Sequence, residues 1–220
     1  LQLLPSSEGG LRIVRRSGIP EAVSISLPKP TAGPLRLLFL ASGMKDWEEE
    51  EKAVLEMAEA LEIETVICES GTRQELIELA GQFRPHLLHL AVPVKASPGG
   101  AAVSLPDRSG EVKEISAEDL ARDLDDSVSG VVLSRVGGSA QAQHLFCQRL
   151  SAKMPMAVAW MAQAAVLQPF YKALAEGASL EDALLSPKKG AELSGTVAAL
   201  LPFPALYSQA DLTGPLIDSG

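Results

Sequence analysis

Short apolar runs alternate with amphipathic segments through the first half of the chain. The strongest run, Leu35–Ala41, is almost continuously apolar, as expected of a strand buried on both faces of a parallel sheet. Further runs follow at Glu64–Cys68 and within Arg84–Val94, and each gap holds a segment with helical spacing of its apolar residues. This β-α-β-α-β order predicts an α/β fold, with a mostly parallel sheet, right-handed crossovers and helices on both faces.

Helix-start signals lie in both gaps. A helix is expected from about Asp46, which places Glu48–Glu51 at the positive end of its dipole. Consecutive acidic residues fan out around a helix, so we interpret them as a solvated helix start and not as a metal site. The spacing Thr72-x-x-Glu75 predicts a capping box at the start of the second helix.

The second half adds an insertion and continues the alternation. Ala101–Leu105 and Glu111–Ile115 predict a β-hairpin, because the residues between them favour a turn. Two further strands are expected at Gly130–Ser134 and Met156–Trp160, and a last apolar run lies at Ala205–Tyr207. Helices are expected from Ser116 to Leu124, around Ala142–Leu150, at Ala164–Ala175, and from Ser179 until Pro187 stops the helix.

Composition separates three parts of the chain. Residues 1–34 are expected to form a strand pair, Leu11–Arg16 and Ala22–Leu27, followed by a stiff connector rich in proline and glycine. Residues 35–208 form the main domain. Residues 209–220 are polar and glycine-rich, which predicts a linker. Because the chain starts with Leu1, we expect it to be a piece of a longer protein.

Charge and hydropathy exclude several functions. The net charge of −9, with no basic patch, argues against nucleic-acid binding. No apolar run approaches the roughly 20 residues of a membrane span, and the start lacks the features of a signal peptide. The two cysteines lie in apolar surroundings, which fits a cytoplasmic protein without disulfides.

Residue patterns alone indicate no catalytic or metal site. Cys147 lies in a helix three residues after His144, but neither Cys147 nor Cys68 has the electropositive surroundings of a reactive thiol. His86 and His89 are three apart on a strand, so they point to opposite faces and cannot share an ion. The glycines before Ser139 are interpreted as a turn, because the phosphate-binding fingerprints are absent. We therefore predict no metal and no cofactor.

An ordered set of segments is characteristic of one family. The set comprises Leu35–Ala41, Gly71–Arg73, Pro85–Ala91, the hairpin leading to Ile115–Leu120, Val131–Ser134 and Phe170–Gly177. In this order they resemble CHAT domains, which are caspase-like cysteine peptidase domains of bacteria, related to separase and placed in clan CD. The resemblance spans about residues 35–208. It implies a three-layer α-β-α caspase-like sandwich with a mostly parallel central sheet and a β-hairpin insertion.

The resemblance also locates the positions of the family's catalytic residues. A Gly-His-Gly motif, with the general base, follows the third strand of the family, and an Ala-Cys motif, with the nucleophile, follows the fourth. Here Pro93 stands at the histidine position between Val92 and Val94, whereas Val136 stands at the cysteine position. Without a thiolate and an imidazole the covalent step of such a peptidase has neither nucleophile nor base.

The resemblance therefore implies a catalytically inactive pseudo-peptidase that acts as a regulatory or interaction module of a larger bacterial protein. Its partners would be proteins or neighbouring helical-repeat or nucleotide-binding domains. Two alternatives stay open: a displaced dyad of Cys147 with His144 or His89, and a small-molecule sensor that uses the vacated cleft. The residues expected around that cleft are His89, Val92, Pro93, Val94, Ser134, Arg135, Val136 and Gly137.

Overall fold

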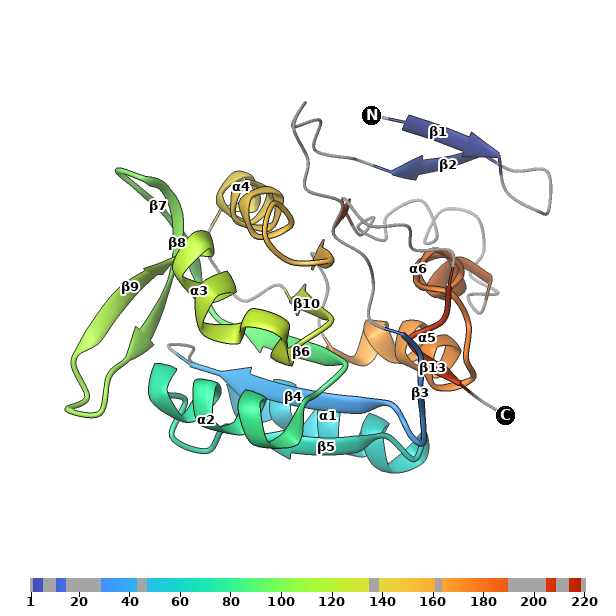
Figure 1. The fold of residues 1–220 in the computed structure, drawn as a ribbon, viewed down its shortest axis with the longest axis horizontal. Coiled ribbons are helices and arrows are strands. Elements are labelled where there is room, and N and C mark those ends of the chain that lie inside the picture. The colour runs from blue at the N-terminus through green and yellow to red at the C-terminus, as the bar shows by residue number, and fades with distance from the viewer. Residues whose placement is uncertain are drawn as a thin grey trace.

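A six-stranded sheet forms the centre of the molecule in the computed structural model (Figure 1), which describes residues 2–5, 11–14, 29–42, 47–134, 139–160, 164–189, 205–208 and 214–218. The strand order is β12-β11-β10-β6-β4-β5. The strands are β4 (Arg36–Ala41), β5 (Glu64–Ile67), β6 (Leu87–Ala91), β10 (Gly130–Leu133), β11 (Met156–Ala159) and β12 (Ala205–Ser208). Only β12 runs antiparallel to its neighbour in this sheet.

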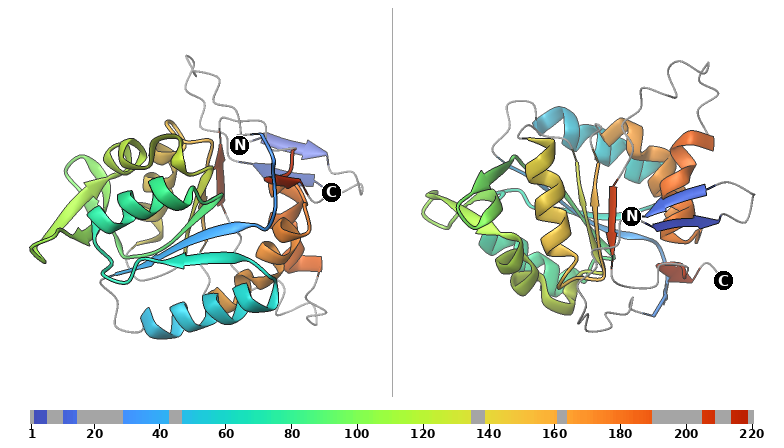
Figure 2. Two further views of the ribbon diagram at one scale, coloured as in Figure 1. Left: turned by 60° about the horizontal axis from the view of Figure 1, so that its bottom comes forward. Right: turned by 90° about the horizontal axis from the view of Figure 1, so that it is seen from above.

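Helices cover both faces of the sheet, each over its own apolar core. On one face lie α1 (Trp47–Ala60), α5 (Ala164–Ala175) and α6 (Leu180–Lys189). On the other lie α2 (Arg73–Phe83), α3 (Ala117–Leu124) and α4 (Ala140–Leu150), and a short 3-10 turn, η1 (Asp125–Ser127), follows α3. Figure 2 shows these layers from two sides. The predicted three-layer arrangement with a mostly parallel central sheet is confirmed.

The register places side chains of neighbouring strands in rows. Phe39 of β4 pairs with His89 of β6, which pairs with Val132 of β10. Because successive side chains of a strand alternate between faces, this row lies over α1 and α5, whereas Leu38 and Leu88 point toward α2.

The insertion between β6 and β10 is a three-stranded antiparallel sheet. The predicted hairpin is confirmed as β8 (Gly100–Pro106) and β9 (Val112–Ser116). A third strand, β7 (Val94–Ser97), pairs with β8. The sequence did not predict this strand, because a segment of this length is too short to establish a clear alternation of apolar and polar residues. The Arg149 guanidinium of α4 donates to the carbonyl of Gly99, which fixes the β7–β8 turn against the body of the domain.

Three segments differ from expectation. The strand predicted at Leu11 is confirmed as β2 (Leu11–Val14), but it pairs with β1 (Gln2–Pro5), whereas Ala22–Leu27 lie outside the described residues. Helix α6 continues past Pro187, because a proline in the last turn removes only one hydrogen bond while Leu180 and Ala183 stay buried in the core.

The end of the chain also returns to the fold. Residues 214–218, expected to belong to a linker, include β13 (Ile217–Asp218), which pairs with β3 (Thr31–Ala32). Leu216 and Ile217 are buried, so apolar contacts hold this segment in place. The limits of the domain stay a prediction. No helix in the described ranges is both long and apolar enough to cross a bilayer.

Candidate functional site

The carboxyl ends of β4, β6 and β10 are the place where an α/β sheet presents its ligands and catalytic groups. Ser134 follows β10 directly, is fully buried, and donates its backbone N–H to the carbonyl of Leu90 at 3.2 Å. Arg135, Val136 and Gly137, which complete this side of the expected cleft, lie outside the described residues. The assignment of Val136 to the family's cysteine position therefore stays a prediction.

The segment after β6 offers no group that moves a proton. Val92 and Val94 are fully buried, and Val94 pairs with Val103 as the first residue of β7. Pro93 is half-buried between them. Of the cleft residues that the structure describes, only Pro93 reaches solvent, since His89 and Ser134 are also fully buried.

Buried polar atoms border the ends of β10 and β11. The Ser134 hydroxyl, the Gln143 side-chain carbonyl and the Trp160 indole N–H have no hydrogen-bond partner in the described part of the chain. The Gln143 amide donates to the backbone carbonyl of Ser134 at 3.5 Å. These three atoms have essentially no surface that water reaches.

His89 is held in a buried polar cluster that links three elements. Its Nδ1 shares a hydrogen bond with the hydroxyl of Tyr171 on α5 at 2.9 Å, and its Nε2 lies 3.4 Å from Oε1 of Glu50 on α1. The imidazole also packs edge-on against Phe39 of β4, with ring centroids 5.3 Å apart. Burial raises the pKa of Tyr171 well above its usual value, and the nearby Glu50 carboxylate raises it further.

The position of Glu50 corrects the interpretation of the acidic helix start. Glu48 and Glu49 are exposed as expected, but Glu50 is buried and faces the sheet. Its spacing to Val54 and Met57 places all three on one side of α1, and this spacing is the signal that could have identified it. In this position His89 joins α1 and α5 to the sheet.

Both thiols are buried in apolar surroundings. Burial alone raises the pKa of Cys147 far above its usual value, and Cys147 packs in the core beneath α2, α3 and α4. Burial, with a smaller effect of Glu75, raises the pKa of Cys68 to about 12. Only the thiolate is an effective nucleophile, so this burial disfavours reaction of either cysteine near neutral pH.

The remaining histidines have partners that do not include a thiol. His144 Nδ1 shares a hydrogen bond with the Tyr207 hydroxyl at 2.8 Å. His86 precedes β6, where its Nδ1 accepts from the backbone N–H of Arg36 at 2.9 Å and its Nε2 lies 2.6 Å from Thr31 Oγ1. Burial, assisted by the charge of Arg36, lowers the pKa of His86 to about 4. His86 and His89 thus lie in separate environments.

The helix starts near the same edge of the sheet have clear caps. Thr72 Oγ1 accepts from the N–H of Glu75, so the predicted cap of α2 is confirmed. A complete capping box also requires the Glu75 carboxylate to accept from the N–H of Thr72. This part of the prediction is wrong, because the carboxylate accepts from the N–H groups of Glu69 and Ser70. Ser139 caps α4 by accepting from the N–H of Ala142, whereas the two glycines before it lie outside the described residues.

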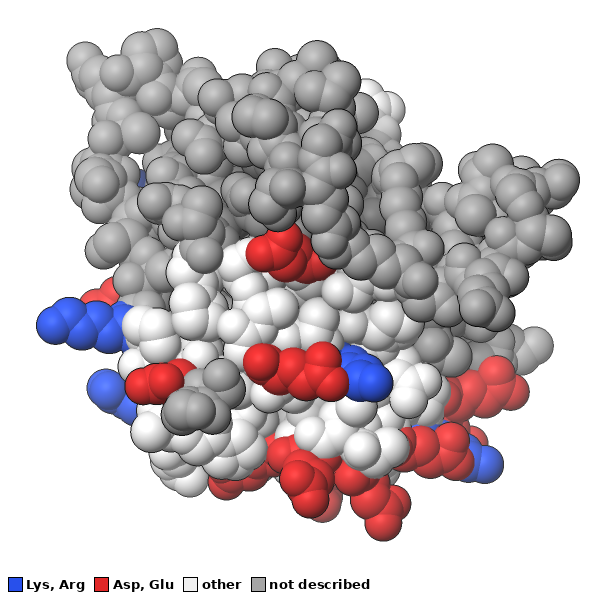
Figure 3. Space-filling model, turned by 90° about the vertical axis from the view of Figure 1, so that its right-hand side faces the viewer, with Lys and Arg blue, Asp and Glu red and all other residues white. Residues whose placement is uncertain are grey.

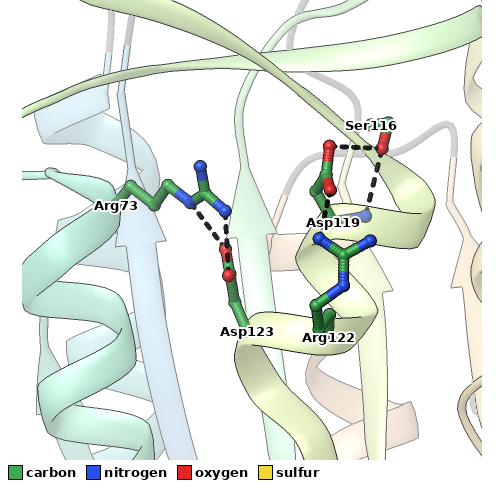
Figure 4. Close-up of polar contacts among 5 residues, drawn as sticks. All are labelled: Arg73, Ser116, Asp119, Arg122 and Asp123. Atoms are coloured by element: carbon green, nitrogen blue, oxygen red, sulfur yellow. Dashed lines mark hydrogen bonds and ion pairs between the residues drawn. The ribbon is translucent and has the colours of Figure 1, made fainter.

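An ion pair that the sequence did not reveal joins α2 to α3. Arg73 donates from Nε and Nη2 to the two carboxylate oxygens of Asp123, at 2.6 and 2.8 Å (Figure 4). One turn earlier in α3, Asp119 accepts from Arg122 and from the Ser116 hydroxyl. Each of these five side chains has at least one partner among the others, which is typical of a structural contact.

Metal ligation finds no support in these side chains. Over the described ranges, no group of three or more histidine, cysteine, aspartate or glutamate side chains lies close enough to hold an ion. The described residues therefore offer buried polar groups, some of them without a hydrogen-bond partner, and two buried thiols.

Comparison with known proteins finds a similar solved structure but no similar sequence. No protein-family model matches the chain, and no curated protein sequence matches it. Among solved structures, the chain is similar to the crystal structure of caspase-1 from Spodoptera frugiperda, with a TM-score of 0.43 and 10% sequence identity, over 95% of this chain and 100% of that one.

Proposed function

We propose that this chain is a catalytically inactive, caspase-like domain of the CHAT type, which acts as a regulatory or protein-interaction module of a larger bacterial protein. The observation that carries the proposal is the state of the two thiols: both are buried and both have a raised pKa. A cysteine peptidase needs an accessible thiolate at neutral pH.

The residues after the third strand support the same conclusion. Pro93 has no group that accepts a proton, and it takes the position that the resemblance gives to the general base. The valines on either side are buried and β-branched, so their backbone N–H groups lack the open approach that flanking glycines give to an oxyanion. The proposal is thus that the fold is retained, whereas the general base and the oxyanion-binding site are lost.

A displaced dyad is disfavoured by the layers of the fold. Cys147 packs on the face covered by α2, α3 and α4, whereas His89 points to the face covered by α1 and α5. The sheet itself separates the two side chains. His144, on the same helix as Cys147, shares its Nδ1 with Tyr207.

Peptide hydrolysis tests the proposal. The purified chain is incubated with fluorogenic peptides that carry lysine or arginine before the scissile bond, alongside matched Cys147→Ser and Cys68→Ser variants. We expect all three proteins to release fluorophore at the buffer rate. Turnover by the unmodified chain that disappears in either variant would overturn the proposal. Turnover that persists in both variants would indicate a contaminating peptidase, which a further round of purification removes.

A further inference from the structure

The edge strand β5 has one side free. The N–H groups of Glu64 and Cys68 donate to the carbonyls of Leu35 and Phe39, both at 2.9 Å. Because hydrogen-bonding direction alternates along a strand, the N–H and C=O groups of Thr65 and Ile67 point away from β4. Within the described part of the chain these outward groups have no partner, since β5 ends the sheet.

The other edge of the sheet is different. There β12 runs antiparallel to β11, and the hairpin of β1 and β2 lies against it (Figure 2). The free edge of β5 therefore stands out as the side on which the central sheet can gain a strand.

Apolar side chains lie on both sides of this edge. Ile67 packs against the core beneath α1, and Val66 packs against the core beneath α2. Both stay half-buried, because no strand covers their outer flank. A strand added to β5 would bury the remainder of both side chains and pair the outward backbone groups.

The segment that contains β5 is acidic, although Arg36 of the neighbouring strand β4 pairs in register with Glu64. Residues 53–72 contain five glutamates and neither lysine nor arginine, and all five glutamates are exposed (Glu56, Glu59, Glu62, Glu64 and Glu69). Of these, Glu56 lies near Lys52, at 3.7 Å. Acidic side chains also crowd the lower part of the molecule in Figure 3, where α1 and β5 lie in Figure 1.

We infer that the β5 edge binds an extended, basic segment of a protein partner, which adds a strand to the central sheet. Backbone pairing gives such a complex its affinity, and lysine or arginine side chains of the partner meet the surrounding glutamates. A second copy of the chain is the poorer occupant, because pairing β5 with itself would place two acidic segments, each with exposed Glu62, Glu64 and Glu69, side by side. The inference rests on the interaction role proposed above, but its test measures no proteolysis, so each can fail alone.

A model peptide provides the probe. An eight-residue peptide of alternating lysine and valine, acetylated and amidated, is titrated into the folded chain while amide hydrogen exchange is followed by NMR. Exchange at Thr65 and Ile67 is expected to slow by at least about tenfold, as for amides that enter a new hydrogen bond. Exchange at Val66, whose N–H already faces β4, should change much less, and this residue is the internal control.

Three comparisons separate backbone pairing from charge. Thr65→Pro removes an outward N–H and leaves the bonds to β4 intact, so we expect about tenfold weaker binding, whereas Thr65→Val keeps the N–H and the affinity. The double variant Glu62→Gln/Glu64→Gln should bind more weakly and with a smaller dependence on salt. A peptide with every backbone nitrogen methylated keeps its charge but can donate no backbone hydrogen bond to β5, and it should not bind.

Several results would overturn the inference. The inference fails if the basic peptide does not bind at millimolar concentration. It also fails if a glutamate–valine peptide or the N-methylated peptide binds as well as the basic peptide. The inference likewise fails if the peptide slows amide exchange elsewhere in the unmodified chain but not at Thr65 and Ile67. This measurement does not depend on whether Thr65→Pro folds. Self-association that Thr65→Pro abolishes, without peptide binding, would assign the edge to a second copy.

Discussion

At the scale of single residues, the buried cluster of Glu50, His89 and Tyr171 shows how this fold tolerates ionisable groups in its core. Each side chain comes from a different element, and the imidazole lies between the other two. A buried charge is costly unless another group compensates it, so the three residues depend on one another. The cluster ties α1 and α5 to the sheet through the histidine that one alternative placed in a displaced dyad.

Tyr171→Phe tests this dependence. The substitution removes the hydroxyl that pairs with His89 Nδ1 and leaves a buried nitrogen without its partner. We expect a loss of about 1–3 kcal/mol in the free energy of unfolding, measured by urea denaturation. The matched control is Tyr207→Phe, whose hydroxyl pairs with the less buried His144 and should cost less. An equal loss in the two variants would contradict the role assigned to the cluster.

His86 gives the stability a defined dependence on pH. Its pKa is about 4 in the fold and about 6.5 in the unfolded chain, so the unfolded chain takes up the proton first as the pH falls. The contribution of His86 is therefore complete above pH 6.5 and decreases between pH 6.5 and about 4. His86→Gln should flatten this part of the profile of unfolding free energy against pH. A profile with unchanged slope would show that His86 is not buried as a neutral base.

At the scale of elements, the helices on the α2 side are joined by polar links as well as by apolar packing. Arg73 and Asp123 form a two-bond ion pair across α2 and α3, with side chains 38% and 12% exposed. The pair between Arg108 and Glu78 has a similar distance, but its side chains are 74% and 50% exposed. Solvent screening should make the second pair much weaker than the first.

The two arginines thus form a matched pair of variants. Arg73→Ala should lower the free energy of unfolding by about 1–3 kcal/mol, because it leaves the mostly buried Asp123 carboxylate without its partner. Arg108→Ala should cost much less, because solvent screens this exposed pair. Chemical denaturation of both variants at low and high salt measures the difference. Equal costs would mean that the α2–α3 link contributes no more than a surface pair.

At the scale of the whole molecule, apolar periodicity was sufficient to predict the central sheet and its helices. Leu35–Ala41 and the run around His89 became neighbouring strands, because continuous apolar runs fit only the buried interior of a parallel sheet. Features that depend on tertiary contacts escaped prediction. Glu50 appeared solvated because its neighbours are acidic, and β7 was too short to show its period.

The candidate site was predictable only in part, for a related reason. The sequence shows which residues stand after β6, but only the structure shows that Val92 and Val94 are buried. The sequence also places Cys147 in an apolar segment, but only the three-dimensional packing shows that the sheet lies between this thiol and His89. Relations between faces of a sheet follow from register and not from local spacing.

Thiol alkylation of the native chain tests the central claim most directly. The folded protein and free glutathione are treated with iodoacetamide at pH 7, and the modification of Cys68 and Cys147 is followed by mass spectrometry. We expect both cysteines to react at least about a hundredfold more slowly than glutathione until urea unfolds the chain, because burial suppresses the thiolate. A cysteine that reacts faster than glutathione in the folded protein would reveal an activated nucleophile and would contradict the account.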